Sequence, residues 1–248
     1  VEPGESKGGR GSRSLTLKGD GMAKGDDLLL TLEQKVAPVH TALVVVDVQN
    51  DFVAEGGFFD RTGGDVASIQ AAIPPLLRLI EHARRAGVLV VFVRAIYDPE
   101  YLSGPMIERN RRRHLEMPRC LTGTWGADFY KIEPAPDEPI VVKHRYSAFM
   151  GTSLDQLLRQ RGIRSLLLTG VATDVCVEST ARDAYFLDYY VAVVADCCGA
   201  AREEYHRDAL ARFERDYGGV TSSAEVIGAW ERLHALGSPA ASGTPSRA

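Results

Sequence analysis

Three residues whose types suit hydrolytic chemistry each follow an apolar segment of the chain. The pairs of segment and residue are 42–46 with Asp47, 140–142 with Lys143, and 166–168 with Cys176. A carboxylate can accept the proton of a thiol, an ammonium can stabilise both the carboxylate and a thiolate, and a thiolate can attack a carbonyl carbon. Together the three residue types predict acyl transfer to water through a thioester.

The surroundings of Cys176 add to this prediction. The segment 166–168 has the composition of a buried strand, a Thr-Gly pair breaks it, and from Thr173 onward the apolar residues follow a helical period. Cys176 therefore falls in the first turn of a helix after a strand, where unpaired backbone N–H groups and the helix dipole favour negative charge. We expect both effects to lower the pKa of the thiol, and the N–H groups of Ala172 and Cys176 to stabilise an oxyanion.

Each of the three residues also has a simpler structural explanation. An Asp after a strand is a common cap, and a Lys at a strand end can extend its ammonium to solvent. Free Cys is among the most buried residue types, so Cys176 can serve packing alone. A functional interpretation therefore depends on the elements that bring the three residues together.

The apolar segments predict those elements. Valine-rich and leucine-rich runs indicate strands buried on both faces, and segments with a helical period alternate with them. We expect strands at 42–46, 88–93, 140–142, 166–168, 191–195 and 219–221, and helices at 66–86, 153–160, 173–189, 203–216 and 223–236. Pro74-Pro75 either divides the first helix or begins a second one, and Gly87 ends it. Such alternation is typical of a three-layer α/β/α fold, a doubly wound parallel sheet of about six strands.

Residues 97–138 interrupt the alternation with an irregular segment that contains Gly and Pro. Long irregular insertions in compact domains are usually lids or contact surfaces. The segment includes the basic cluster Arg109–Arg113, which is either part of such a surface or a solvated charged face.

Composition limits the classes of protein. The chain has 248 residues, a net charge of −4, 45% hydrophobic and 25% charged residues, and no apolar run near the roughly 20 residues that span a bilayer. We expect a single domain at 26–236 between a disordered extension at 1–25 and a flexible tail at 237–248, located in the cytoplasm, with no nucleic-acid or membrane partner. The four cysteines lack zinc-site spacing and are expected to be thiols.

Three motifs carry a resemblance to a known family. They are Asp47-x-Gln-Asn-Asp51-Phe52, Lys143-x-Arg-Tyr146-Ser-x-Phe149 and Thr169-Gly-Val-Ala-Thr-Asp-Val-Cys176-Val. In combination they resemble the isochorismatase-like cysteine hydrolases, over about residues 40 to 230. The resemblance implies the strand order 3-2-1-4-5-6, an Asp47–Lys143–Cys176 catalytic triad, a cis peptide bond between Val171 and Ala172, and a homo-oligomer, either a dimer or a tetramer.

Two departures narrow the activity. Residues 51–70 contain no histidine, whereas the nicotinamidases of this family bind a metal ion there, so we expect neither a metal nor another cofactor. True isochorismatases lack the cysteine, and residues 170–183 are most similar to the ureidoacrylate and carbamoyl-amide branch. We therefore expect an amidohydrolase that cleaves a C–N bond of a small amide or ureido/carbamoyl compound with water. The alternatives are an isochorismatase-type vinyl-ether hydrolase, in which Cys176 is incidental, and a non-catalytic protein that retains the fold.

Four further residues are candidates for substrate contacts. Phe52, Tyr146 and Phe149 occur within the motifs and are expected to line the pocket, unless they only pack in the core. Arg94, just past the strand expected at 88–93, is a candidate partner for a substrate carboxylate, although a strand-end arginine needs no special role.

Overall fold

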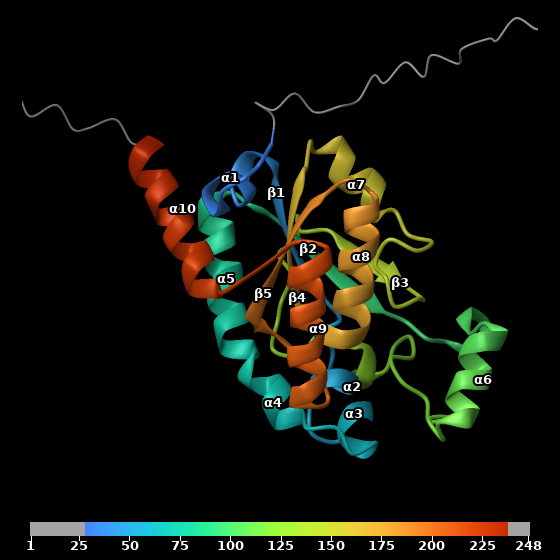
Figure 1. Ribbon diagram of the computed structural model, residues 1–248. Helices are drawn as coiled ribbons and strands as arrows, with labels where there is room; N and C mark the ends of the chain where they lie inside the picture. The colour runs from blue at the N-terminus through green and yellow to red at the C-terminus, as the bar shows by residue number, and fades with distance from the viewer. Residues whose placement is uncertain (1–27, 238–248) are drawn as a thin grey trace, which may run out of the picture.

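A parallel sheet with helices on both faces forms the centre of the molecule (Figure 1). The structure, a computed structural model, describes residues 28–237. The extension expected at 1–25 and, apart from Gly237, the expected tail lie outside the described residues. Within the described part the sheet has the order β3-β2-β1-β4-β5-β6, so the expected fold and strand order are confirmed. The strands are β1 (Thr41–Val46), β2 (Leu89–Ala95), β3 (Ile140–Lys143), β4 (Ser165–Val171), β5 (Tyr190–Gly199) and β6 (Gly219–Thr221).

Ten α-helices accompany the strands in residues 28–237. They are α1 (Leu32–Lys35), α2 (Asn50–Val53), α3 (Phe58–Arg61), α4 (Val66–Ala71), α5 (Ile73–Ala86), α6 (Gly104–Arg112), α7 (Leu154–Gln160), α8 (Glu178–Phe186), α9 (Glu203–Asp216) and α10 (Ser223–Gly237). The 3₁₀ turns are η2 (Pro38–His40), η3 (Pro99–Tyr101) and η4 (Trp125–Ala127), and η5 (Thr173–Val177) is a π-helical turn. None of the helices in this range is long and apolar enough to cross a membrane.

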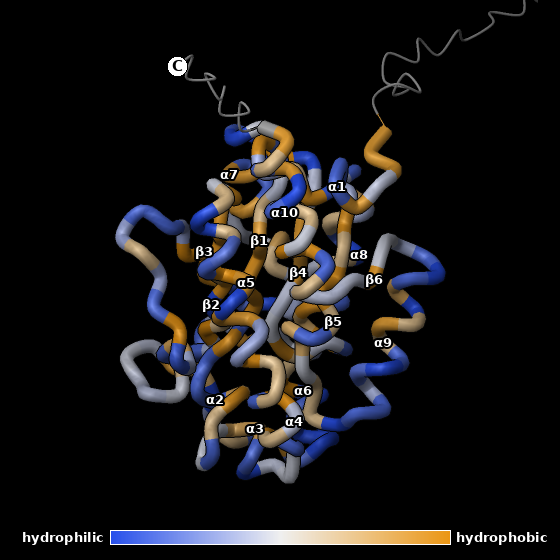
Figure 2. The backbone as a smooth tube through the Cα atoms, turned by 90° about the vertical axis from the view of Figure 1, so that its left-hand side faces the viewer, coloured by the Kyte–Doolittle hydropathy of each residue, from blue (hydrophilic) through white to orange (hydrophobic). Residues whose placement is uncertain are grey.

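Strand β1 shows why the sheet is covered on both faces. All six of its residues are buried, and successive side chains point to opposite faces. Leu43 and Val45 pack with α4, α5 and α10, whereas Ala42, Val44 and Val46 pack with α7, α8 and α9. Figure 2 shows the resulting hydrophobic centre along the strands, with hydrophilic segments toward the outside.

Prolines and glycines set several element boundaries. The segment expected as one helix at 66–86 is divided, because Pro74 and Pro75 occupy the first turn of α5, where a missing N–H costs nothing. Gly87 ends α5 in a left-handed conformation with φ 73°, as expected.

The region after β4 differs from the expectation. The strand continues through the Thr-Gly pair to Val171. Residue 170 is a glycine because its φ is 106° and a Cβ at this position would collide with the carbonyl oxygen of Val46 on β1. The single helix expected at 173–189 is instead the turn η5 followed by α8, since the N–H of Val177 reaches back five residues to the carbonyl oxygen of Ala172.

The topology gathers the candidate residues at one edge. Because all the strands are parallel, their carboxyl ends lie at the same edge of the sheet. The strand order reverses between β1 and β4, which is the point where open α/β sheets form their ligand crevice. Asp47 follows β1 and Cys176 lies in the turn after β4, so both flank this point.

Candidate active site

The ammonium of Lys143 joins Asp47 and Cys176 into one buried cluster, called the triad below. Lys143 Nζ lies 2.7 Å from Asp47 Oδ2, 3.4 Å from Cys176 Sγ and 2.8 Å from the carbonyl oxygen of Arg145. Asp47 and Lys143 are fully buried, and Cys176 is 6% exposed. The three protons of the ammonium therefore each have an acceptor, and the cation is fixed between the acid and the thiol.

Burial decides the charge states of the triad. It raises the pKa of Cys176 to about 12, because loss of water disfavours the thiolate, and Asp47 adds to the rise while Lys143 opposes it. The expectation of a lowered thiol pKa is therefore wrong, since complete burial outweighs the neighbouring ammonium. Burial also raises the pKa of Asp47 against the opposing charge of Lys143. For Lys143, burial alone lowers the pKa, but the attraction of Asp47 and Cys176 reverses this and raises it.

Gln49 fixes the backbone next to Asp47. Its fully buried amide donates to the carbonyl oxygens of Ala95 and Ala127, each at 2.9 Å, and accepts the N–H of Ala95 at 2.7 Å. The N–H of Asp47 itself donates to the carbonyl oxygen of Val93 on β2. These bonds hold the acid in register with the neighbouring strand. Gln49 belongs to the motif that begins at Asp47, but its role in holding the backbone next to Asp47 is seen only in the structure.

The turn between β4 and Cys176 borders the same cavity as the thiol. The peptide bond between Val171 and Ala172 is cis. Val171, Ala172, Val175 and Cys176 all line the same cavity. The backbone that we expected to receive an oxyanion therefore borders the cavity beside the thiol.

This cavity has a volume of about 230 Å³, and Cys176 is the triad residue that lines it. Aromatic residues form much of its lining, namely Phe52, Phe58, Phe59, Tyr97, Tyr146 and Tyr205. Phe52 and Tyr146 are thus at the cavity, as the motifs suggested. Phe149 and Arg94 are not among the lining residues: Phe149 packs on Tyr189 with ring centroids 6.0 Å apart, and the guanidinium of Arg94 lies 4.6 Å from the ring centre of Phe129.

Four arginines also line the cavity and are called the arginine wall below. They are Arg109, Arg113, Arg119 and Arg202. Asp174 is the acid among the lining residues, so the cavity is positively charged although the whole chain has a net charge of −4. The sequence drew attention to the cluster Arg109–Arg113 without deciding its role, whereas nothing in the local pattern singled out Arg119 or Arg202.

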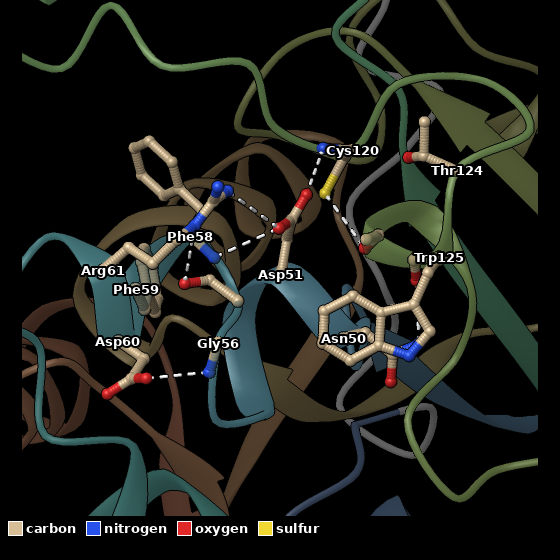
Figure 3. Close-up of polar contacts among 12 residues, drawn as sticks. Asn50, Asp51, Gly56, Phe58, Phe59, Asp60, Arg61, Cys120, Thr124 and Trp125 are labelled. Atoms are coloured by element: carbon tan, nitrogen blue, oxygen red, sulfur yellow. Dashed lines mark hydrogen bonds and ion pairs between the residues drawn. The ribbon is translucent and has the colours of Figure 1, made fainter.

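Asp51 connects two segments of the cavity wall (Figure 3). Its carboxylate accepts the N–H of Phe58 at 3.1 Å and the N–H of Cys120 at 2.6 Å, and Arg61 lies 3.7 Å away. Phe58 lines the cavity, and Cys120 is the chain neighbour of Arg119, which also lines it. Gly126 must be a glycine, because a Cβ there would collide with the same carboxylate. Among residues 28–237, no group of three or more His, Cys, Asp or Glu side chains is placed to hold a metal ion.

The class of protein follows from a comparison with known families. Residues 41–225 match the family model of the isochorismatase domain, and this range includes all three triad residues and most of the sheet. The chain therefore belongs to the isochorismatase family.

Individual relatives refine the comparison. The chain is 36% identical over 207 residues to the ureidoacrylate amidohydrolase RutB of Enterobacter sp. (strain 638), an alignment that covers 78% of this chain and 90% of the relative. Among solved structures, it is similar to a cysteine hydrolase from Pseudomonas syringae pv. phaseolicola 1448A, with a TM-score of 0.69 and 28% identity over 79% of this chain and 94% of the other. It is also similar to N-carbamoylsarcosine amidase from Thermoplasma acidophilum, with a TM-score of 0.61 and 31% identity over 74% of this chain and 96% of that one.

Proposed function

We propose that the protein is a cysteine amidohydrolase that cleaves a C–N bond of a small amide, ureido or carbamoyl compound. The observation that carries the proposal is the ammonium of Lys143, held between Asp47 and Cys176 below a cavity of about 230 Å³. The names of two relatives, a ureidoacrylate amidohydrolase and an N-carbamoylsarcosine amidase, support the choice of bond.

The first half of the reaction forms a thioester. Because burial raises its pKa to about 12, Cys176 is a neutral thiol in the resting site and must lose its proton as it attacks. Asp47 accepts this proton while the sulfur bonds to the substrate carbonyl carbon, and the raised pKa of Asp47 makes it a stronger base than an exposed carboxylate. The carbonyl oxygen becomes an oxyanion beside the N–H groups of Ala172 and Cys176. When the C–N bond breaks, Asp47 returns the proton to the departing nitrogen.

The second half hydrolyses the thioester. Asp47, ionised again, takes a proton from water as the water oxygen attacks the same carbonyl carbon, and the C–S bond breaks. The thiolate recovers the proton from Asp47, so the site returns to its starting state. Throughout, Lys143 remains charged and stabilises whichever of its two partners is negative, because both lie within 3.4 Å of its nitrogen.

The direct test is ammonia release from a panel of ureido acids, carbamoyl amino acids, biuret and nicotinamide. We expect one class of ureido or carbamoyl compound to be turned over, and the activity to disappear in Cys176→Ala. Equal activity in the two proteins would contradict the assignment of the nucleophile. Isochorismate is tested separately by analysis of its hydrolysis products, because cleavage of a vinyl ether releases no ammonia. A vinyl-ether hydrolase would keep its activity in Cys176→Ala and lose it in Asp47→Asn.

We also propose that the chain forms a homo-oligomer, a dimer or a tetramer, in the cytoplasm. Ile140 and Val142 on the edge strand β3 and the nearby Met150 are 44–59% exposed, which supports burial of this edge by another subunit. All four cysteines are free thiols, which supports a reducing compartment. Analytical ultracentrifugation should give two or four times the mass of one chain, and a monomer at micromolar concentration would contradict the oligomer.

A further inference from the structure

Arg119 is a buried cation without an acidic partner. The residue is only 9% exposed, yet among residues 28–237 no carboxylate lies within 4.0 Å of its guanidinium. Its hydrogen bond to Asn110 Oδ1 is long, at 3.4 Å. Buried charges are normally paired, because an unpaired ion loses its hydration without compensation. Since Arg119 lines the cavity, the missing anion can come from a ligand there.

The guanidinium is held in place before any ligand arrives. It lies 4.9 Å from the ring centre of Phe58 and 5.1 Å from that of Tyr97. Asp51 binds the N–H of Phe58 and the N–H of Cys120, and so fixes both the ring and the backbone that carries the arginine. Such a fixed planar fork suits a carboxylate, which it can bind through two parallel hydrogen bonds.

Tyr97 gives the position of Arg119 relative to the triad. Burial raises the pKa of Tyr97, and the charges of Cys176 and Arg119 act on it in opposite directions, so its hydroxyl lies within electrostatic range of both. Both Tyr97 and Arg119 line the cavity that reaches Cys176. A small ligand can therefore place one end at the thiol and its anionic end at the guanidinium.

The other arginines of the cavity are less deeply buried than Arg119 and so have weaker claims to this role. Arg109 is half-buried, and its guanidinium donates to Asn110 Oδ1 at 3.3 Å. Arg113 and Arg202 are exposed, and Arg202 lies 3.7 Å from Glu204. Arg113 acts on the half-buried Asp174, which supplies part of its counter-charge. Exposed cations in water gain little from one further ion pair, whereas Arg119 is already desolvated.

We propose that Arg119 is the residue that binds the carboxylate of the substrate and so selects acidic amides or ureido acids over neutral ones. This inference extends the proposed function by naming the substrate class and the residue that recognises it. It leads to a measurement that does not depend on amide hydrolysis.

The test compares alkylation of Cys176 by iodoacetate, which carries a carboxylate, and by iodoacetamide, which is its neutral counterpart. Rates are followed by mass spectrometry of the peptide that contains Cys176, with free cysteine as the reference. We expect the ratio of the iodoacetate rate to the iodoacetamide rate to exceed that of free cysteine by about 10- to 100-fold, the range of a charge-assisted hydrogen bond. Lys143 contributes equally in every variant, because it remains paired with Asp47.

Arg119→Gln should reduce this ratio to within about threefold of free cysteine, since it keeps a polar side chain but removes the charge. Arg119→Lys should give an intermediate ratio, because the charge remains without the planar fork. The matched control is Arg84→Gln, which removes an arginine bonded to Glu138 at the opposite edge of the sheet and should leave the ratio unchanged. Thermal unfolding identifies any variant that fails to fold. If Arg119→Gln does not fold, Arg119→Lys is compared with the wild type instead.

Two results would overturn the inference. One is an equal loss of rate with both reagents in Arg119→Gln, which would indicate a structural role only. The other is a wild-type ratio no higher than that of free cysteine, including failure of iodoacetate to modify Cys176 at all. If instead the ratio behaves as expected while Cys176→Ala keeps full ammonia release, the carboxylate site stands and the proposed thioester mechanism fails.

Discussion

Cys176 of the triad and the arginine wall line the same cavity, but the charges in the two regions differ in whether they have partners. In the triad, Lys143 lies within 3.4 Å of both Asp47 and Cys176, and these residues come from two strand ends and the turn η5. In the arginine wall, the buried Arg119 has no acidic partner within 28–237 and comes from the irregular segment between β2 and β3. Pairing offsets the cost of burying the charges of Asp47 and Lys143, whereas an unpaired buried cation is available to a ligand.

In the proposed function, the triad carries out bond cleavage and the arginine wall determines which substrates bind. A defect in the triad should reduce turnover of every substrate, and a defect around the arginine wall should change which substrates bind. The following variants test this division, and they are ordered from the largest expected effect to the smallest.

Asp47→Asn should have the largest effect on turnover. The amide cannot accept the thiol proton, and loss of a general base typically costs about 10²- to 10⁴-fold in rate. We expect kcat to fall by this amount for acidic and neutral substrates alike, measured by steady-state ammonia release. A loss confined to acidic substrates would break the division, because it would give Asp47 a role in selection.

Lys143→Met should shift the pH dependence. In the wild type, kcat/KM should rise as Asp47 loses its proton, at a pH above the ordinary carboxylate pKa of 3.8, and should stay high up to the approach of the thiol pKa of about 12. Because Lys143 lowers the pKa of Asp47, its removal should move this acid limb to higher pH.

The same variant should be less stable by roughly 3–5 kcal/mol at neutral pH, since it leaves a buried carboxylate unpaired. Protonation of Asp47 relieves this cost, so the loss should be smallest at low pH and grow as the pH rises through the pKa of Asp47 in the folded state. Urea unfolding at several pH values measures it. An acid limb that stays in place would contradict the coupling between the two residues.

Asp51→Asn should weaken the hydrogen bonds that hold Phe58 and the backbone next to Arg119 in place. The amide can accept one of the two N–H groups but not both, so we expect a loss of about 1–3 kcal/mol in the free energy of unfolding. We also expect KM for acidic substrates to rise more than kcat falls, because Arg119 is less well fixed. The matched control is Asp60→Asn, an exposed acid that accepts only the N–H of Gly56, and its cost should be below about 1 kcal/mol. Equal costs for the two variants would argue against the role of Asp51 in joining Phe58 and Cys120.

Arg84→Gln should have the smallest effect. The side chain of Arg84 is 40% exposed and bonds to Glu138 at the edge of the sheet away from the cavity, so we expect a loss of only about 0.2–1 kcal/mol. Chemical denaturation measures this difference, and kinetic constants should stay at wild-type values. A change in substrate preference would mean that the selectivity attributed to Arg119 is only a general effect of charge.

The sequence predicts the triad better than the arginine wall for a physical reason. The strands that carry Asp47 and Lys143 and precede Cys176 are short apolar runs, and parallel strands must end at a common edge, so local patterns suffice. The burial of Arg119 depends instead on a hydrogen bond between Asp51 and Cys120, which are 69 residues apart. No local pattern encodes such a contact, and the position of Arg94 near a strand end led to that residue instead, although it is half-buried beside Phe129.

The thiol pKa shows a second limit of sequence reasoning. A helix start and a nearby lysine indicate a lowered value, but the depth of burial depends on the packing of the whole domain and raises it. The division of the helix expected at 173–189 has a similar origin, since the turn η5 forms around the carbonyl oxygen of Ala172 rather than from any breaker residue.

The most direct test of the central claim is single-turnover rapid quench with a substrate found in the ammonia-release panel, followed by mass spectrometry of the protein. The account predicts a transient acyl or carbamoyl adduct that maps to Cys176, with no adduct and no turnover in Cys176→Ala. Product formation by Cys176→Ala at the wild-type rate would contradict the account, because the reaction would then proceed without the thiol.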